Sequence, residues 1–412
     1  MAHTLGYADA ARLLGGGESP LIKTLDKATG GLMLGLSVAL PGVLSLFDAK
    51  TDFIRLSHDL VRRASERRSG LSRYDRTQRF EAAHTVIVVV AFFEALKEAD
   101  LPFHFADLEL TAAEQLTIAT GSPNSELLPA LFSTAPPVPL AHHGQDITLG
   151  ALQDFYLRVR GDLHVFVEGL KLGERLSLRD RRVLLEQLGS TVDAAIRRYS
   201  ELLRQLAVEF PEVGFWVNLG EHAATRTEVR ALRAGLSRLG DALAQSSSGH
   251  DPDARRRGLA RAYRADLDLP VVSGGEVPDG LHVPTLGTAY LTPRFRVGEI
   301  AGADKPNDED WWARQEVRDD LDEFLVGHLT SSFALAAPLL VLGQPGSGKS
   351  VLTKVLAARL PAADFMPVRV PLRDAHAAAD LHEQLEQAIR KATGERLEWP
   401  ALVASAGDAL PV

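Results

Sequence analysis

The chain has 412 residues, of which 45% are hydrophobic and 24% are charged, and its net charge is −9. This composition is that of an ordinary globular protein, and the length suffices for two domains with separate cores. The negative charge argues against a surface that coats nucleic acid, and we find no sequence signal for nucleic-acid binding. The absence of cysteine excludes disulfides and thiolate metal sites.

The first feature along the chain is an uncharged stretch at residues 30–47 (GGLMLGLSVALPGVLSLF). Glycines and Pro41 interrupt it, whereas a membrane-spanning helix needs about 20 strongly apolar residues. Two hypotheses stay open: a buried core hairpin, or a glycine-rich amphipathic segment that inserts into a membrane when several copies cluster. The N-terminus lacks a basic region followed by a long apolar core, so we expect no export signal and a cytoplasmic location.

Residues 1–245 are predicted to form an α-helical domain with an effector or adaptor role. Its clearest helix covers residues 74–99, where apolar side chains follow helical spacing although the run 85–90 is rich in β-branched residues. Residues 121–148 contain Gly-Ser-Pro and Pro-rich stretches and are predicted to be a loop. Further helices are predicted at residues 111–118, 149–159, 178–209 and 225–244.

Residues 246–289 are predicted to be a linker. They begin with a polar, flexible stretch at residues 246–252 and continue through three consecutive arginines into a Pro- and Gly-rich connection. A second domain, residues 290–412, follows. Within it, Asn307 is predicted to cap a helix that runs to about Leu329, because acidic residues in the first turn favour the helix dipole.

A phosphate-binding motif lies at residues 343–350, with the sequence GQPGSGKS. The apolar run 339–342 before it predicts a buried strand, and residues 351–360 after it have helical spacing, so a helix N-terminus points at the same loop. Lys349 is expected to contact the β- and γ-phosphates of ATP, and the Ser350 hydroxyl to ligate Mg²⁺. The predicted nucleotide-binding residues are Gly343, Gln344, Pro345, Gly346, Ser347, Gly348, Lys349, Ser350 and Val351.

The acidic motif that a P-loop enzyme needs for Mg²⁺ and water is not found after this loop. The residues that follow predict the P-loop helix, one strand at 365–372 and a helix near 376–393. A doubly wound sheet around a nucleotide takes roughly one hundred residues or more. We therefore expect the chain to stop inside its own nucleotide domain, with no catalytic residue present. ATP hydrolysis is expected only of a full-length protein.

The strand and its continuation, residues 367–374 (PVRVPLRD), resemble the second strand of the NACHT family within the STAND class of P-loop NTPases. The resemblance covers roughly residues 290–412 and implies an acidic strand beginning near Leu410. The extended segment around Tyr290 and Arg294 resembles the one that leads into NACHT domains, where residues near the adenine are often found, but a packing role for Tyr290 and a surface role for Arg294 are commoner. NACHT proteins are signalling switches in which ATP-driven homo-oligomerisation brings N-terminal effectors together. Bacterial proteins of this layout are linked to antiphage defence.

The expected fold is thus a mainly α-helical N-terminal bundle followed by the start of an α/β P-loop domain with an incomplete parallel sheet. The predicted function is that of an ATP-binding signalling switch. Two alternatives remain: a stand-alone P-loop ATPase or kinase with a regulatory helical domain, and a truncated, non-hydrolysing interaction module.

Overall fold

The computed structural model describes residues 5–19, 22–23, 50–66, 73–103, 131–143, 145–169, 176–210, 213, 243, 251–271, 283–300, 302, 304–374, 379–406 and 409–412. The chain divides into two compact units. The N-terminal unit comprises Met1–Arg67 and Thr77–Val217, and the C-terminal unit comprises Arg68–Arg76 and Asn218–Val412. The sequence analysis places the end of the helical domain later, at residue 245. Residues 30–47, the uncharged stretch for which a buried hairpin and a membrane-inserting segment both remain open, lie outside the described residues.

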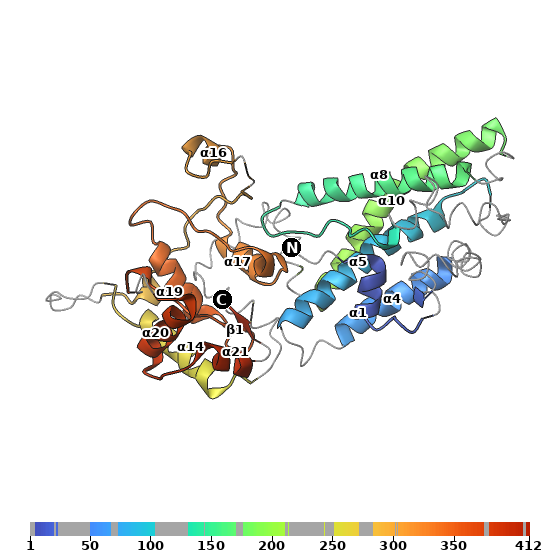
Figure 1. Ribbon diagram of the computed structural model, residues 1–412. Coiled ribbons are helices and arrows are strands. Elements are labelled where there is room, and N and C mark those ends of the chain that lie inside the picture. The colour runs from blue at the N-terminus through green and yellow to red at the C-terminus, as the bar shows by residue number, and fades with distance from the viewer. Residues whose placement is uncertain are drawn as a thin grey trace. The chain divides into compact units, whose positions relative to one another are not determined.

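The described part of the N-terminal unit is helical (Figure 1). A cluster of aromatic rings ties its first helices together: Tyr7 lies 5.0 Å from Phe53 and 5.6 Å from Phe132 between ring centroids, and Phe53 lies 4.6 Å from Phe93. These rings are fully buried, so they form the centre of the core. The helices are α1 (Tyr7–Leu13), α4 (Lys50–Glu66), α5 (Arg73–Glu98), α8 (Gln145–Glu168) and α10 (Leu178–Glu209).

Helix α5 is the most deeply buried helix of this unit. Every residue from 80 to 93 is buried, including the β-branched run 85–90 that by itself resembles a strand. A helix that is apolar on all sides must be surrounded by other elements, which explains why residues of high strand propensity form a helix here. The helix predicted at residues 74–99 is confirmed.

Helices α8 and α10 pack side by side (Figure 1). A capping box starts α10: the Asp180 N–H donates to Ser177 Oγ at 3.2 Å, and the Ser177 N–H donates to Asp180 Oδ2 at 3.3 Å. The helix predicted at residues 178–209 is therefore confirmed, whereas the one predicted at residues 149–159 is longer in the structure. The helices predicted at residues 111–118 and 225–244, and part of the loop predicted at residues 121–148, lie outside the described residues.

The C-terminal unit mixes helices with extended segments. The linker predicted at residues 246–289 is wrong in part, because it contains a 14-residue helix, α14. Leu259, Tyr263 and Leu267 are buried on one face of α14, so this helix is a packed element. The elements are α14 (Ala254–Leu267), α15 (Leu286–Ala289), α16 (Glu309–Ala313), α17 (Leu321–Leu329), α18 (Phe333–Ala336), α19 (Lys349–Arg359), β1 (Phe365–Met366), a 3₁₀ turn (Leu372–Asp374), α20 (Leu381–Thr393), α21 (Trp399–Ala406) and β2 (Leu410–Pro411).

The single helix predicted from Asn307 to Leu329 is also wrong. The structure has two helices, α16 and α17, and Asp308 caps the first of them. Between them the main chain of Arg318 forms an antiparallel bridge with Phe295, with N–H to carbonyl distances of 2.7 and 2.9 Å. The Arg318 guanidinium lies over the rings of Phe295 and Phe324 and pairs with Asp320 at 2.7 Å. These non-local contacts favour an extended segment over a continuous helix.

Strands β1 and β2 pair in parallel, with Phe365 opposite Leu410. Helices α20 and α21 connect them, as a parallel pair requires. Beyond the short strands, Val412 continues the pairing by donating to the Met366 carbonyl at 3.2 Å and accepting from the Val368 N–H at 2.9 Å. The residues predicted as a strand at 365–372 thus start as one, and a further strand begins near Leu410, where the family resemblance expects one.

Candidate phosphate-binding site

The loop 343–350 leads directly into helix α19, which begins at Lys349. Two of its residues, Gly346 and Gly348, have φ angles of 81° and 87°, a region that residues with a Cβ rarely adopt. Gly348 is the N-cap of α19, and its carbonyl accepts the N–H groups of Val351 and Leu352 at 2.9 and 2.8 Å. The glycines at these two positions therefore give the loop its turn into the helix.

Several main-chain donors at this helix start have no acceptor among the described residues. Gly348 has no side chain to cap the helix. No described residue accepts a hydrogen bond from the main-chain N–H of Gly348, Lys349 or Ser350. Free N–H groups and the positive end of the helix dipole together form a site that favours an anion.

The Lys349 side chain folds back over the loop. Its Nζ donates to the carbonyls of Gly343 at 2.7 Å and Gln344 at 2.9 Å, and lies 3.4 Å from Ser347 Oγ. All of these partners, in the part of the chain that the structure describes, are uncharged. The ammonium therefore has no carboxylate partner there, and a phosphate would supply the missing negative charge.

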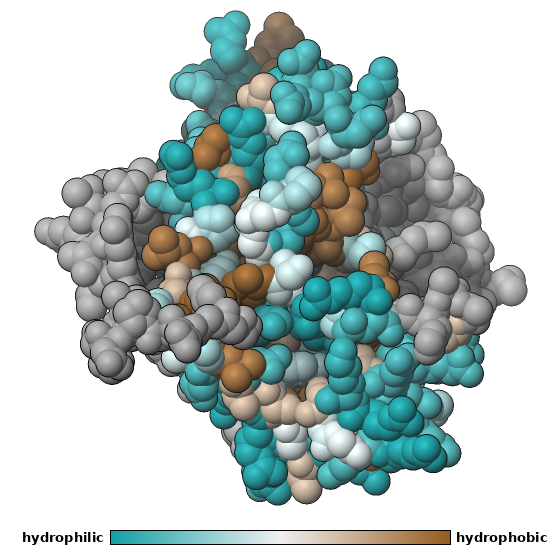
Figure 2. All heavy atoms as spheres, turned by 90° about the vertical axis from the view of Figure 1, so that its left-hand side faces the viewer, coloured by the Kyte–Doolittle hydropathy of each residue, from teal (hydrophilic) through white to brown (hydrophobic). Residues whose placement is uncertain are grey.

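The strand predicted at residues 339–342 is contradicted by the structure. These residues form no regular secondary structure, and their exposed fractions are 40% for Leu339, 64% for Leu340, 44% for Val341 and 48% for Leu342. A strand that enters a P-loop is buried only when strands flank it on both sides, and no described segment does so. Figure 2 shows that hydrophobic side chains are also exposed among hydrophilic ones over one face of the molecule.

The residues expected near an adenine differ in their surroundings. Arg294 is exposed. Tyr290 is half-buried, and burial, followed by the nearby Asp322 carboxylate, raises the pKa of its hydroxyl to about 12. The Tyr290 hydroxyl is shielded from solvent and has no hydrogen-bond partner among the described residues. The hydroxyl is therefore neutral at physiological pH, and its donor and acceptor positions are both open to a ligand.

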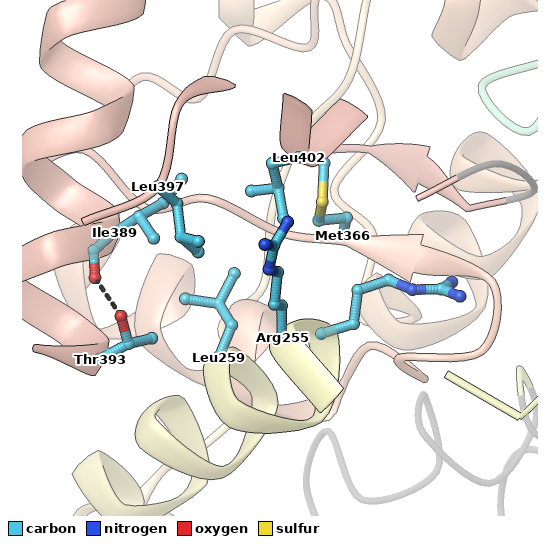
Figure 3. Close-up of a pocket in the computed structure, with 8 residues that line it drawn as sticks. Arg255, Leu259, Met366, Ile389, Thr393, Leu397 and Leu402 are labelled. Atoms are coloured by element: carbon cyan, nitrogen blue, oxygen red, sulfur yellow. Dashed lines mark hydrogen bonds between the residues drawn. The ribbon is translucent and has the colours of Figure 1, made fainter. Parts of the chain in front are cut away.

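A small cavity lies between α14, β1, α20 and the residues that follow α20 (Figure 3). Leu259, Met366, Ile389 and Leu402 line it, and its volume is about 10 Å³. The Thr393 hydroxyl on its wall donates to the Ile389 carbonyl at 2.9 Å, so it is not free to bind a guest. The cavity holds at most about one water molecule and cannot be a nucleotide site.

Residues 2–221 match the model of a family described as NACHT N-terminal helical domain 7 (NNH7). This match covers more than half of the chain. The chain belongs to the NNH7 family. The NNH7 region ends close to the boundary between the two compact units and before residue 245, where the sequence analysis ends the helical domain. Neither a search of curated proteins nor a search of solved structures found a match.

None of the helices that the structure describes in the NNH7 region or beyond it has the length and apolar character needed to cross a membrane. The family match concerns the helical region and does not reach the loop 343–350. The resemblance of residues 290–412 to a P-loop NTPase and the binding of ATP and Mg²⁺ therefore remain predictions.

Sequence reasoning missed three residues that lie around the first turns of α19. Arg369 donates through Nε to Thr353 Oγ1 at 3.1 Å, and its main-chain N–H donates to the Tyr263 hydroxyl at 2.9 Å. The sequence contains a signal for Thr353, because a hydroxyl one helical turn after Ser350 lies on the same side of the predicted helix. Arg369 is an isolated cation in an apolar segment, which is a weaker signal, and Tyr263 lies 106 residues earlier in the chain.

Proposed function

We propose that this NNH7 protein binds ATP with Mg²⁺ at residues 343–350 and acts as a nucleotide-dependent signalling switch of the NACHT type. One observation carries the proposal. The Lys349 ammonium and the free N–H groups at the start of α19 surround the same loop, and the described residues supply no carboxylate to Lys349. Such a cluster of fixed positive groups fits a polyphosphate.

The residues present fit the ligand as follows. Lys349 would exchange its carbonyl partners for the β- and γ-phosphate oxygens, and the free main-chain N–H groups would donate to the phosphates. Ser350 is exposed at the first turn of α19, and its hydroxyl would ligate Mg²⁺. The bound Mg²⁺ would neutralise phosphate charge.

The NNH7 domain would serve as the effector or adaptor of the switch. In this proposal the nucleotide state controls homo-oligomerisation and thereby the clustering of NNH7 domains. The association of similar bacterial proteins with antiphage defence extends the proposal to that role. The cellular part of the proposal predicts that Lys349→Ala abolishes any protection against phage that the intact gene confers, at unchanged protein level.

A thermal-unfolding experiment tests the binding step. A ligand that binds only the folded state stabilises it by about 2.7 kcal/mol at 100 times its dissociation constant. We expect MgATP to raise the unfolding temperature of the 412-residue chain but not that of Lys349→Ala. Lys354→Ala, which removes another lysine of α19, is the matched control and should respond like the wild type. An equal response of wild type and Lys349→Ala would refute the proposal.

A further inference from the structure

The first turns of α19 are held by a chain of hydrogen bonds that does not belong to the loop motif. Thr353 Oγ1 donates to the Ser350 carbonyl at 3.1 Å and accepts from Arg369 Nε at 3.1 Å. Because Thr353 follows Ser350 by three residues, the Arg369 guanidinium lies within about one helical turn of the expected Mg²⁺ ligand.

The other end of this chain is anchored on α14. The main-chain N–H of Arg369 donates to the hydroxyl of Tyr263 at 2.9 Å, and Tyr263 is buried. Helix α14 packs along α19. The backbone of Arg369 is therefore fixed by one helix while its side chain reaches the other, which limits where its charge can lie.

The charge of Arg369 adds to the positive groups around the first turns of α19. Arg369 Nε bonds to Thr353 just after the first turn of α19, close to the positive end of the helix dipole, and Lys349 has no carboxylate partner among the described residues. Asp374, at the end of the same segment, is paired with Lys391 at 2.6 Å. That bond, with smaller effects from Arg373 and Arg369, lowers the pKa of the Asp374 carboxyl.

We propose that Arg369 is a positioning residue of the phosphate site: through Thr353 it fixes the turn of α19 that carries Ser350, and it supplies a second cation beside Lys349. This inference rests on the proposed function, because it presumes that a triphosphate and Mg²⁺ bind at the loop. It adds a residue that lies outside the phosphate-binding motif and assigns it to the Mg²⁺-dependent part of binding.

Calorimetric titration of the full 412-residue chain with ATP, once with Mg²⁺ and once with EDTA, tests the inference. Arg369→Gln removes the guanidinium and its charge, while the shorter glutamine amide can still donate to Thr353. We expect it to weaken MgATP binding about tenfold, to reduce the gain in affinity that Mg²⁺ provides, and to leave the unfolding temperature of the free protein nearly unchanged. Arg369→Lys restores the charge and should recover part of the affinity.

Arg373→Gln is the matched control. The Arg373 side chain is 85% exposed, and its ion pair with Asp374 is long, at 3.8 Å. Its loss should therefore change binding less than twofold. Thr353→Val has the same shape but no hydroxyl, so it removes the hydrogen bond to Arg369 without changing Arg369 itself. It should reduce the gain in ATP affinity that Mg²⁺ provides in the same way. If Arg369→Gln is unstable, Thr353→Val alone tests the role of Arg369.

The outcomes separate the two proposals. If the wild type binds MgATP and both Arg369→Gln and Thr353→Val bind it within twofold of the wild type, the role of Arg369 is refuted while the proposed function stands. Equal weakening with Mg²⁺ and with EDTA indicates a purely structural role and also refutes it. If the wild type binds no nucleotide, both proposals fail.

Discussion

The hydroxyl of Tyr263 accepts a hydrogen bond of 2.9 Å from the main-chain N–H of Arg369. The main-chain groups of Met366 and Val368 form hydrogen bonds with Val412, which follows β2. The main-chain groups of the alternate residues, Pro367 and Arg369, therefore face the opposite edge of the pair. There Pro367 has no N–H, and the next donor, that of Arg369, is bound by Tyr263. Helix α14 therefore covers the Arg369 end of this edge of the parallel pair.

The covered edge predicts the effect of removing a single oxygen. Tyr263→Phe keeps the ring but leaves the part-buried N–H of Arg369 without its partner, and because a fully buried unsatisfied donor costs about 1–3 kcal/mol, we place this cost at about 1 kcal/mol. We expect the free energy of unfolding of the C-terminal unit to fall by that amount in urea denaturation. Tyr290→Phe is the matched control, because the Tyr290 hydroxyl has no hydrogen-bond partner among the described residues. Equal stability of wild type and Tyr263→Phe would show that the edge is not covered in this way.

A buried arginine joins α14 to the segment after α19. Arg256 is 8% exposed, and its Nη1 donates to the carbonyls of Ala362 and Ala363 at 3.2 and 3.3 Å. Its Nε also lies 3.3 Å from Asp253 Oδ2. Arg256→Ala leaves the carbonyls of Ala362 and Ala363 without this donor, and an unsatisfied buried polar group costs about 1–3 kcal/mol, so we expect the unfolding free energy to fall by that order.

The neighbouring Arg257 provides the control for this prediction. It pairs with Asp251 at 3.0 Å in a largely exposed position, and exposed pairs contribute about 0–1 kcal/mol. Arg257→Ala should therefore change urea stability by less than about 1 kcal/mol. A similar loss in both variants would indicate that burial of Arg256 does not determine the stability of this junction.

A buried histidine makes the N-terminal unit sensitive to acid. His84 on α5 is fully buried with Nε2 3.0 Å from the Tyr199 hydroxyl, and burial lowers its pKa from 6.5 to about 3. Between these values the unfolded chain binds a proton that the folded chain does not. Stability should therefore fall as the pH drops from about 6.5 towards 3, by up to about 1.4 kcal/mol per pH unit.

The variant His84→Gln cannot titrate and should lack this dependence. The measurement is the unfolding free energy of wild type and variant at pH 6.5 and at pH 4.5. The account predicts a smaller loss for the variant, whatever its stability at pH 6.5. The same loss in both proteins would mean that another group titrates.

A second histidine acts in the opposite direction. His58 on α4 lies 2.7 Å from Glu94 Oε1 on α5, and this hydrogen bond, against a smaller effect of burial, raises the pKa of His58 above 6.5. The folded chain holds the proton more tightly than the unfolded chain. The contribution is therefore fully present below about pH 6.5 and is lost as the pH rises through the raised pKa.

Glu94→Gln removes the charge that holds this proton. We expect the variant to be less stable than the wild type at pH 5.5 and to approach it at pH 8.5. Chemical denaturation at these two pH values checks the prediction. A stability difference that does not change with pH would contradict it.

The sequence predicted what depends on local pattern. Helices α5 and α10 follow from apolar periodicity, whereas the capping pair Ser177 and Asp180 at the start of α10 was recognised only in the structure. Helix α14 was missed because its arginines and flanking glycines and prolines suggested a linker, although its buried face repeats every four residues. The break between α16 and α17 depends on the pairing of Arg318 with Phe295, which helical periodicity does not reveal.

In the candidate site too, the residues that are adjacent in sequence were predicted and those contributed by distant segments were not. The glycines, Lys349 and Ser350 are adjacent in sequence, so the motif itself located the loop and the helix start. Arg369 contacts Thr353, which lies 16 residues earlier in the chain. Tyr263 contacts Arg369, which lies 106 residues later. Exposure of residues 339–342 was not foreseen, since burial of a strand depends on neighbours that the strand's own sequence does not specify.

Calorimetric titration of the 412-residue chain with ATP in the presence of Mg²⁺ tests the central claim most directly. The account predicts saturable binding of one nucleotide per chain, loss of that binding in Lys349→Ala, and retention of it in Lys354→Ala. Absence of binding by the wild type, or equal affinity of the wild type and Lys349→Ala, would contradict it.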